Sequence, residues 1–497
     1  MNRVKTFLLV LFASMLVAVV PAANAGTAPA GSSAVKKGKG KKKTKKTKKV
    51  PAGAFKGALA PLSGKGRWFV DRTGRVVQLR GVNEVSKHAP YYPAADGFGA
   101  DDAALLARHG FNVVRLGVDF QGLMPEPGQP SETYISNLAK TVNVLTRAGI
   151  YTLVDFHQDG FSPKYNGNGF PDWWAVDDGL SNPNVYFPVY YLLNPAMQRA
   201  FEHFWMNTTV EGKGLQDWFI QGLLAVVKKF RSNSHVIGYE TFNEPWPGAD
   251  YSACYDAETG CPDLERERIM PFARKVVAAT RKLTKRQQIF VEPFVTYNFG
   301  TPTSLPGSTG ASLAVHNYAV SAEGDAKVVE QSVKAARRDS KPVVLTEFGA
   351  TGDTAKLDRL TSLYDGGLMS WIFWAYNENL VTEESTPNPG SVVNQPVLQA
   401  LTRPYPVALT GKPTSLSFDP ATRVMSLKFK TARTGGGKFI RRLPSVIATQ
   451  KLVYPDGYRV RVTGATVTSR PCAGRLTLRN HARAKAVSVT VKPGGTC

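Results

Sequence analysis

The chain has 497 residues, of which 43% are hydrophobic and 20% are charged, and its formal net charge is +24. The positive charge belongs to two flanking regions: Lys36 to Lys49 contains ten lysines and no acid, and residues 405–497 contain seventeen lysines and arginines against two aspartates. The long central part is nearly neutral, and beyond residue 25 no stretch reaches the roughly 18 apolar residues of a membrane-spanning helix, which excludes a protein held by such helices.

Residues 1–25 have the pattern of a secretory signal peptide. Arg3 and Lys5 precede an apolar run from Phe7 to Val20, and the small-residue pattern Ala23-Asn24-Ala25 follows. A short apolar run with these flanks is typical of a signal peptide that is removed from the mature protein. We therefore expect cleavage near Ala25 and a secreted, extracellular protein.

Residues 26–53 are small, rich in lysine and without periodicity, which predicts a disordered linker. A solvated tail is the first interpretation of this lysine run, and contact with an anionic surface, either a membrane or a cell wall, is the second. Nucleic acid is not expected as a partner, because the chain is predicted to be secreted and has no recognisable nucleic-acid-binding motif.

Residues 54–404 alternate short β-rich segments with stretches long enough for a helix, after two short strands expected around the turn Arg72-Thr73-Gly74. Near-continuous apolar strands that alternate with helices predict a parallel sheet buried on both faces. Eight such units predict a (β/α)8 TIM barrel with enlarged loops. A doubly wound sheet is the alternative, but no GxGxxG or GxxxxGK[ST] sequence follows any segment. The eight segments are residues 76–82, 112–118, 151–156, 235–244, 288–293, 312–318, 342–349 and 369–376.

Residues 405–497 have a different character. Alternating strands are joined by Asp-Pro, Asp-Gly and glycine-rich turns, as in SLSFDPATRVMSLKFKT and KLVYPDGYRVRVTG. This pattern predicts a small C-terminal β-sandwich domain after the barrel.

The four cysteines fall into two local pairs, Cys254 with Cys261 and Cys472 with Cys497. Four cysteines allow three disulfide connectivities, and sequence proximity favours the two local ones. Disulfides agree with the predicted oxidising compartment. A metal site is less favoured, because neither pair has CxxC spacing or nearby histidines.

Two glutamates end predicted barrel strands in distinctive company. Glu244 lies in Asn243-Glu244-Pro245 at the end of the fourth strand, and Glu347 lies in Thr346-Glu347-Phe348-Gly349 at the end of the seventh. Strand-end groups of a barrel meet in one mouth. Two carboxylates can cleave a glycosidic bond there, one as proton donor and one as nucleophile or electrostatic stabiliser, without a cofactor or a metal. A single such glutamate would more often be a salt-bridge partner.

These motifs resemble the retaining β-glycosidases of clan A, family five. The resemblance implies that Glu244 is the acid/base, that Glu347 is the nucleophile and that Asn243 holds the sugar 2-hydroxyl. It implies further that Arg115 pairs with Glu347 and that Tyr318, near His316, donates to the nucleophile. Trp374 is implied as the apolar floor under the sugar. The alternatives are that Trp374 and His316 are simply core residues.

One branch of that family, the endoglycoceramidases, matches over a longer stretch. DFHQDGFSPKYNGNGFPDWW from Asp155 and YYLLNPAMQRAFEHFW from Tyr190 are similar to that branch. The resemblance implies glycan contacts for Asp155 and His157 of the DxHQD element, for Trp173 of the following loop, and for Lys87 after the first strand. It implies release of an intact oligosaccharide from the ceramide of a glycosphingolipid, glucosyl- or galactosyl-linked.

The segment from Trp174 to Leu193 independently indicates a lipid. Large apolar side chains are concentrated in what should be a loop beside the mouth, and such a surface suggests a lipid groove. The alternative is a packed small core beneath the loop. The apolar side chains are Trp174, Tyr186, Phe187, Tyr190, Tyr191, Leu192 and Leu193.

The loop after the predicted fifth strand, VEPFVTYNFGTPTSLPG, offers no confident glycan contact. Glu292 is a third strand-end carboxylate there, for which structural pairing is the first interpretation and sugar binding the second. The leading hypothesis for the chain is thus a secreted retaining endo-β-glycosidase acting on glycosphingolipids, with possible peripheral contact between the basic C-terminal domain and an anionic membrane. The alternatives are a β-glucosidase or cellulase-like hydrolase of soluble β-glucosides, and a noncatalytic glycan-binding protein that retains a barrel.

Overall fold

The computed structural model describes residues 57–381, 392–440, 443–495 and 497. The predicted signal peptide (1–25) and lysine-rich linker (26–53) lie outside the described residues. Within them, no helix combines the length and the apolar character needed to cross a bilayer.

Eight parallel strands close into a barrel in the order β10-β11-β12-β13-β4-β5-β6-β9, as the sequence predicts. The first predicted strand, residues 76–82, divides into β3 (Val76–Val77) outside the barrel and β4 inside it. The other predicted segments each contain one barrel strand. The barrel strands are β4 (Arg80–Glu84), β5 (Val113–Val118), β6 (Tyr151–Phe156), β9 (Val236–Glu240), β10 (Gln288–Val291), β11 (Ser312–Asn317), β12 (Val343–Phe348) and β13 (Ser370–Phe373).

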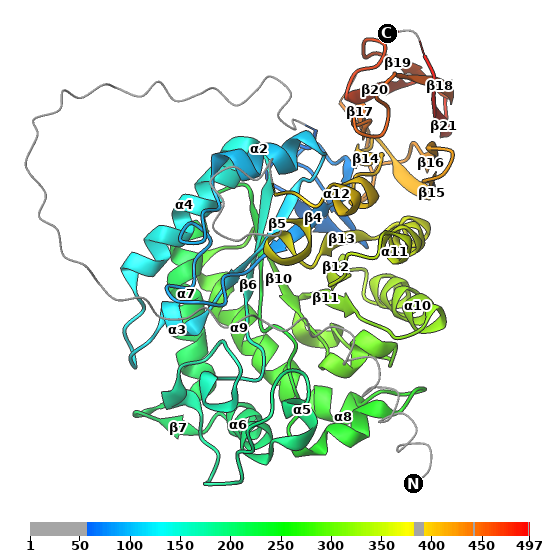
Figure 1. Ribbon diagram of the computed structural model, residues 1–497. Helices are drawn as coiled ribbons and strands as arrows, with labels where there is room; N and C mark the ends of the chain where they lie inside the picture. Colours follow the sequence, from blue (N-terminus) through cyan, green and yellow to red (C-terminus); the bar gives the residue numbers. More distant parts are fainter. Residues whose placement is uncertain (1–56, 382–391, 441–442, 496) are drawn as a thin grey trace, which may run out of the picture.

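Helices surround the barrel because each carries one apolar stripe (Figure 1). In α4 (Glu132–Ala148) the buried residues recur at three- and four-residue intervals, for example Leu138, Val142 and Leu145. Ser131 Oγ accepts the Tyr134 N–H, and Gly149 ends the helix at φ 79°. The other long helices are α2 (Ala100–Arg108), α7 (Leu215–Phe230), α9 (Met270–Leu283), α10 (Ala322–Arg338) and α11 (Thr354–Gly367), with α12 (Gln395–Leu401) leading out of the barrel.

The amino end of the barrel is closed by apolar side chains. β1 (Ser63–Lys65), β2 (Trp68–Val70) and β3 form a small antiparallel sheet, and Phe69 from it packs against Phe290 inside the barrel. The interior cluster includes Leu153, Ile237 and Ile372. A substrate is therefore expected to approach the barrel at the carboxyl ends of its strands.

The longest connections extend from those carboxyl ends. Figure 1 shows α5 (Tyr190–Leu193), α6 (Pro195–Trp205) and α8 (Pro262–Leu264) gathered at the end of the molecule away from the C-terminal domain. The remaining short elements are α3 (Phe120–Leu123), η2 (Pro163–Tyr165), η3 (Asp172–Trp174), β7 (Thr209–Val210), β8 (Lys213–Gly214), η4 (Ala249–Tyr255), η5 (Glu265–Ile269), η6 (Val295–Phe299), η7 (Gly307–Thr309) and η8 (Tyr376–Leu380).

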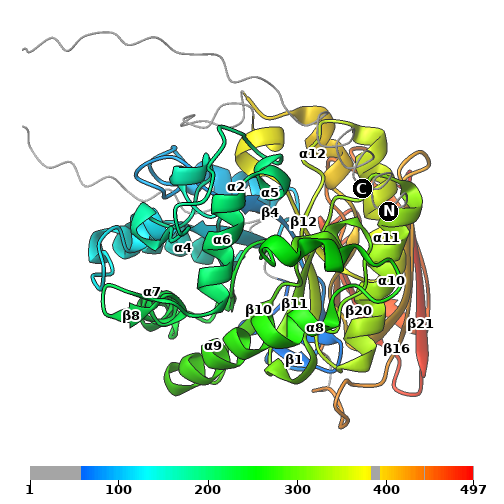
Figure 2. The same ribbon diagram turned by 90° about the horizontal axis from the view of Figure 1, so that it is seen from below.

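The C-terminal domain is a sandwich of two four-stranded sheets, β14-β17-β20-β19 and β15-β16-β21-β18, as the sequence predicts. Alternate residues of β16, such as Met425, Leu427 and Phe429, are buried between the sheets. The strands are β14 (Tyr405–Ala408), β15 (Lys412–Asp419), β16 (Val424–Lys430), β17 (Ser445–Ala448), β18 (Tyr458–Thr463), β19 (Ala465–Val467), β20 (Arg475–Asn480) and β21 (Ala486–Pro493). In Figure 2 this domain lies beyond α10 and α11.

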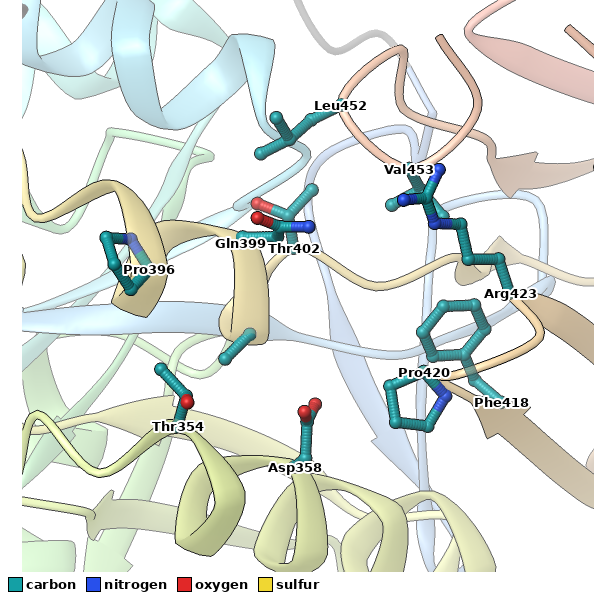
Figure 3. A pocket seen from close by; sticks show the side chains of 11 residues that line it. Thr354, Asp358, Pro396, Gln399, Thr402, Phe418, Pro420, Arg423, Leu452 and Val453 are labelled. Carbon is teal, nitrogen blue, oxygen red and sulfur yellow. The ribbon is translucent and has the colours of Figure 1, made fainter. Parts of the chain in front are cut away.

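The two domains share contacts. Arg403 joins Asp358 and Asp365 of α11 to the backbone of Phe418, and Val76 exchanges backbone hydrogen bonds with Leu409. A polar pocket of about 220 Å³ remains between α11, α12 and the sandwich, lined by Asp358, Gln399 and Arg423 among others (Figure 3). Both predicted local disulfides are present, Cys254–Cys261 and Cys472–Cys497.

Candidate active site

Two buried glutamates lie close together at the open end of the barrel. Glu347 is on β12, and Glu244 lies four residues beyond the end of β9. A carboxylate oxygen of one is within 4.8 Å of a carboxylate oxygen of the other. This separation is near the roughly 5 to 5.5 Å of retaining glycosidases and below the roughly 6.5 to 9.5 Å that inverting enzymes need to admit a water. The pair suits attack by one carboxylate with proton transfer by the other.

The backbone at Glu244 is held by side chains from neighbouring strands. Glu244 has φ 42°, a left-handed conformation that is uncommon outside glycine. Gln158 Nε2 donates to the carbonyl oxygens of Asn243 and Glu244 at 2.8 and 3.0 Å. Asn243 Nδ2 donates in return to Gln158 O at 3.0 Å, and Glu292 Oε2 accepts the Glu244 N–H at 3.0 Å. The acid-bearing turn is thus fixed from both sides.

Arg115, on β5, lies fully buried among carboxylates. Its Nη1 is 2.5 Å from Glu347 Oε1, the pair that the sequence predicts. Burial lowers the pKa of Arg115, but the surrounding carboxylates hold it well above its usual range. Arg115 therefore supplies a permanent positive charge beside Glu347. Its other partners are Asn83 Oδ1 at 3.0 Å, Asn243 Oδ1 at 2.7 Å, Asp155 Oδ1 at 3.0 Å, Glu240 Oε1 at 2.6 Å and Glu292 Oε1 at 3.3 Å.

His316, on β11, contacts three carboxylates. Its Nδ1 is 2.8 Å from Glu244 Oε1 and 3.5 Å from Glu347 Oε2, and its Nε2 is 3.3 Å from Glu292 Oε1. Burial lowers the pKa of His316, but these three groups raise it well above its usual value. The raised pKa favours the imidazolium, in which Nδ1 donates to Glu244 Oε1 and Nε2 faces Glu292 Oε1 as an ion pair. Asn298 Nδ2 also donates to Glu244 Oε1, at 2.6 Å, so Oε2 of Glu244 is the oxygen suited to carry a proton.

Two donors hold the carboxylate of Glu347. Arg115 contacts Oε1, and the Tyr318 hydroxyl donates to Oε2 at 2.9 Å. Burial raises the pKa of Tyr318 well above its usual value, so the phenol keeps its proton. Burial raises the pKa of Glu347 above its usual value, although His316 and Arg115 act in the opposite direction. These contacts orient the carboxylate toward the mouth.

A mixed aromatic and charged wall adjoins the glutamates. Trp374 follows β13 and is packed near Tyr318, its ring stacks on His157 with centroids 5.2 Å apart, and Lys87 Nζ is 4.5 Å from its centroid. Lys87 also pairs with Asp159 at 2.8 Å. An aromatic face bordered by charged groups suits a sugar ring, whose faces are apolar and whose edges are hydroxyls.

Two of the predicted glycan contacts, Asp155 and Trp173, are paired with protein groups in this structure. Asp155 is fully buried between Arg115 and His157 Nδ1, at 3.0 and 2.8 Å, because it lies within β6 and faces the barrel interior; Asp159, four residues later, is the aspartate beside Lys87. Trp173 donates from Nε1 to Pro125 O at 2.9 Å and packs edge-on against Trp218 of α7. Trp173 is partly exposed, and its contact with a glycan stays a prediction.

The apolar segment divides into a buried part and an exposed part. Trp174, Tyr190 and Tyr191 are buried, and the Tyr190 ring occupies the space where a Cβ at Gly160 would stand, 2.5 Å from its nearest atom. Tyr191 accepts the Gly160 N–H at 3.1 Å and packs on Trp246, two residues after Glu244. The exposed side chains beside this small core are Leu180, Tyr186, Phe187 and Leu193, with 47%, 61%, 51% and 51% of their surface accessible.

Several residues of the site are absent from the sequence prediction. Asn83 is the next-to-last residue of β4 and Asp159 follows β6 by three residues, so a position near a strand end was a signal for both. Glu240 is the last residue of β9, four residues before Glu244, and Asn298 lies in η6 after β10. No motif marks these two, and only the closed barrel brings them to Arg115 and Glu244. Glu292 is paired with charged and backbone groups, as the first interpretation holds.

Among the residues that the structure describes, two groups of donor atoms lie close enough to be tested for a metal: Glu240, Glu292 and His316, and Glu244, His316 and Glu347. Both depend on His316. Because the carboxylates around it favour the imidazolium, whose nitrogens are both donors, this donor set fits hydrogen bonding better than metal ligation.

Comparisons with known proteins agree with this geometry. Residues 70–380 match the family model of cellulase (glycosyl hydrolase family 5), and residues 403–492 match the glycoside hydrolase family 5 C-terminal domain. Endoglycoceramidase I of Rhodococcus hoagii is 34% identical over 84% of this chain and 86% of its own length, and endoglycoceramidase of Cyanea nozakii is 29% identical over 85% and 91%. Endo-glycoceramidase II from Rhodococcus sp., solved as a ganglioside GM3 complex, superposes with a TM-score of 0.69 at 23% identity, over 86% of this chain and 99% of that one.

Proposed function

The chain belongs to glycosyl hydrolase family 5, and from that premise we propose that it is a retaining endo-β-glycosidase that releases intact oligosaccharide from the ceramide of glycosphingolipids. The observation that carries the proposal is the group of exposed apolar side chains Leu180, Tyr186, Phe187 and Leu193, here called the apolar patch, on the segment whose Tyr191 packs against Trp246, two residues after Glu244. A hydrolase of soluble β-glucosides has no use for such a patch, whereas a lipid aglycone would cover it.

The proposed chemistry is a double displacement. Glu347 attacks the anomeric carbon while Glu244 transfers its proton to the ceramide oxygen, so that the glycosidic C–O bond breaks and ceramide leaves. Glu244, now a carboxylate, takes a proton from water, which attacks the glycosyl-enzyme ester and returns Glu347. Asn243 is suited to bind the sugar 2-hydroxyl, and Trp374 to support the ring.

The position of the patch supports the choice of substrate. Tyr190 and Tyr191 anchor it to Gly160 and Trp246, each within two residues of a mouth-facing carboxylate. A lipid chain that leaves the cleavage point would therefore meet the patch first. The two curated relatives reported above are endoglycoceramidases, and their match along most of both chains supports the same class.

One assay tests the proposal. The purified protein is incubated with glucosylceramide-linked oligosaccharides, galactosylceramide-linked oligosaccharides and soluble cello-oligosaccharides, and products are identified by mass spectrometry. We expect intact oligosaccharide and free ceramide from at least one of the lipids. Cleavage of cello-oligosaccharides alone would establish the soluble-glucoside alternative.

We also propose that the protein is secreted and contacts anionic membranes through its sandwich. One face of sheet β15-β16-β21-β18 supports this role: its outward residues include six basic side chains against one acidic side chain, Asp419. Lys412 lies opposite Lys430, and Arg459 lies opposite Lys492. Like charges placed directly opposite are unfavourable in isolation, and an anionic surface would relieve them. The outward basic residues are Lys412, Lys428, Lys430, Arg459, Arg461 and Lys492.

Secretion has its own test. Export with removal of residues 1–25 should give a protein in the culture medium whose first residue is Gly26, read by N-terminal sequencing. A cell-retained protein that still begins at residue 1 would refute it.

A further inference from the structure

Glu292 lies immediately after β10 and is buried, with 3% of its surface accessible. One oxygen, Oε2, accepts the backbone N–H of Glu244 at 3.0 Å. The other, Oε1, is 3.3 Å from His316 Nε2 and 3.3 Å from Arg115 Nη2. A single carboxylate therefore links the turn that carries the proton donor to the two cations that contact the glutamate pair.

The contact between Glu292 and Glu244 is made at a strained position of the backbone. Glu244 has a left-handed φ of 42° although it is not glycine, a conformation that persists only when surrounding groups impose it. Gln158 binds the two carbonyl oxygens of the turn, and Glu292 binds its N–H. Without an acceptor, that buried N–H would be unsatisfied and the turn would lose the contact on its β10 side.

Neighbouring groups stabilise the negative charge of Glu292. Glu240 shares a side-chain hydrogen bond with it, and both bind Arg115. Burial raises the pKa of Glu240 well above its usual value, and the neighbouring Glu292 adds to this while Arg115 opposes it. Burial also raises the pKa of Glu292, but His316, Glu240 and Arg115 lower it to about 2. The two shifts have opposite directions, so any proton held by this pair favours Glu240, and Glu292 is the member that stays anionic.

We propose that Glu292 is a positioning residue for proton donation: its carboxylate fixes the Glu244 backbone and faces the imidazolium that binds Glu244 Oε1. The proposal rests on the assignment of Glu244 as acid/base. By holding the backbone of Glu244, Glu292 directs Glu244 Oε2 toward the leaving oxygen. It also stabilises protonated His316, whose Nδ1–H donates to Glu244 Oε1, so that Oε1 acts as an acceptor. Its effect is therefore largest when the leaving group needs a proton.

Other charged groups also surround His316 and Arg115, the two cations that Glu292 contacts. His316 faces Glu244, Glu292 and Glu347, with Tyr318 beside it, and Arg115 faces Asp155, Glu240, Glu292 and Glu347. When the charge of Glu292 is removed, His316 loses a neighbouring anion, which favours its neutral form. Because the proposal needs His316 as a protonated donor to Glu244, the alkaline limb of the rate profile then moves to lower pH.

The test uses Glu292→Gln, which keeps an acceptor for the Glu244 N–H but removes the charge, and Glu292→Ala, which removes both. Rates are measured with aryl β-glycosides of graded leaving-group pKa. We expect kcat/KM of Glu292→Gln to fall about tenfold with the most basic leaving groups and little with the most acidic, since acid catalysis contributes on the order of 100-fold or more. Its alkaline limb should move down by about half a pH unit, and Glu292→Ala should lose more.

Glu265→Gln is the matched control. Glu265 is equally buried and accepts hydrogen bonds from Thr303 and Ser304, so this variant separates loss of a buried charge from loss of positioning. It should lower thermal stability without steepening the leaving-group dependence. The proposal is overturned if the Glu292 variants, corrected for folded fraction, parallel wild type across the leaving-group series and keep its pH profile. Because aryl glycosides lack ceramide, this outcome is independent of whether wild type cleaves glycosphingolipids.

Discussion

Arg115 Nη1 lies 2.5 Å from Glu347 Oε1, and both side chains are buried. The same guanidinium contacts carboxylates or amides from four other barrel strands or strand ends. A lysine ammonium cannot reproduce that planar set of donors. The nucleophile's charge and the stability of the strand ends thus depend on one side chain.

We expect Arg115→Lys to lower kcat/KM at least 100-fold and the free energy of unfolding by about 3 kcal/mol, because buried charges would lose a partner. Aryl glycoside kinetics and thermal unfolding measure the two effects. The matched control is Arg80→Lys. Arg80 is a buried arginine at the amino end of β4, opposite the end that carries Asn83, and it pairs with Asp365 of α11. Arg80→Lys should lower the free energy of unfolding, but the molecules that remain folded should turn over substrate at the wild-type rate. An Arg115→Lys enzyme within threefold of wild type would contradict this account of Glu347.

Azide should separate the roles of the two glutamates. Glu347→Ala and Glu244→Ala should each lower turnover of ceramide-linked substrate by about 100-fold or more. In Glu347→Ala, azide can replace the missing nucleophile from the opposite face and give the α-glycosyl azide. In Glu244→Ala, azide intercepts the covalent intermediate and gives the β-azide. Nuclear magnetic resonance of the products decides, and identical stereochemistry from both variants would reject the assignment.

The exposed and buried halves of the apolar segment should respond differently. Replacing exposed Phe187 and Leu193 with serine should lower kcat/KM for ceramide-linked substrate by about 30-fold, or about 2 kcal/mol of lost apolar contact, and spare a soluble aryl glycoside. Tyr190→Ser is the contrast, since Tyr190 is 1% exposed. It should lower the melting temperature and affect both substrates alike. Equal losses on both substrates from the exposed pair would remove the lipid argument.

The sequence could predict the elements that local pattern determines. Apolar runs between helix-length stretches located the barrel strands, and Asn-Glu-Pro and Thr-Glu-Phe-Gly located the paired glutamates. It could not predict which strand residues face inward. Asp155 and Asp159 belong to one motif, yet Asp155 lies within β6, buried beside Arg115, whereas Asp159 lies in the loop after β6, beside Lys87. Glu240 and Asn298 join the site only because barrel closure places β9 and the segment after β10 around β5 and β11.

The stability conferred by His157 should depend on pH. Burial lowers the pKa of His157, but Asp159 and Asp155 raise it to about 9, above the unfolded value of about 6.5. Its folded pKa is the higher one, so its contribution is fully present below about pH 6.5 and is lost as pH rises toward about 9. The unfolding free energies of wild type and His157→Gln should therefore differ most at pH 6, by an amount on the order of 3 kcal/mol more than at pH 9.5. A difference independent of pH would mean that the histidine is neutral when folded.

The basic face of sheet β15-β16-β21-β18 should bind anionic bilayers. The triple reversal Lys430→Glu, Arg459→Glu and Arg461→Glu removes three of its six outward basic residues. Each such residue near an anionic surface contributes about 1 kcal/mol, so we expect vesicle partitioning to fall about 100-fold. Sedimentation with phosphatidylserine-containing vesicles measures this, and the difference should vanish at about 1 M salt, where the Debye length is roughly 3 Å.

Hydrolysis of detergent-dispersed substrate should be unchanged in the triple variant, because the face is remote from the carboxylates. The matched control reverses Lys451, Arg470 and Arg479, which lie on or beside the other sheet and carry the same total charge. If the net charge of the domain attracts the vesicles, both triple variants should bind them equally weakly. If a defined face binds them, only the first triple variant should lose vesicle binding. Equal losses in the two variants would place the attraction in the net charge of the domain, and indifference of both to charge and salt would leave the sandwich as a support for the barrel through Arg403 and Val76.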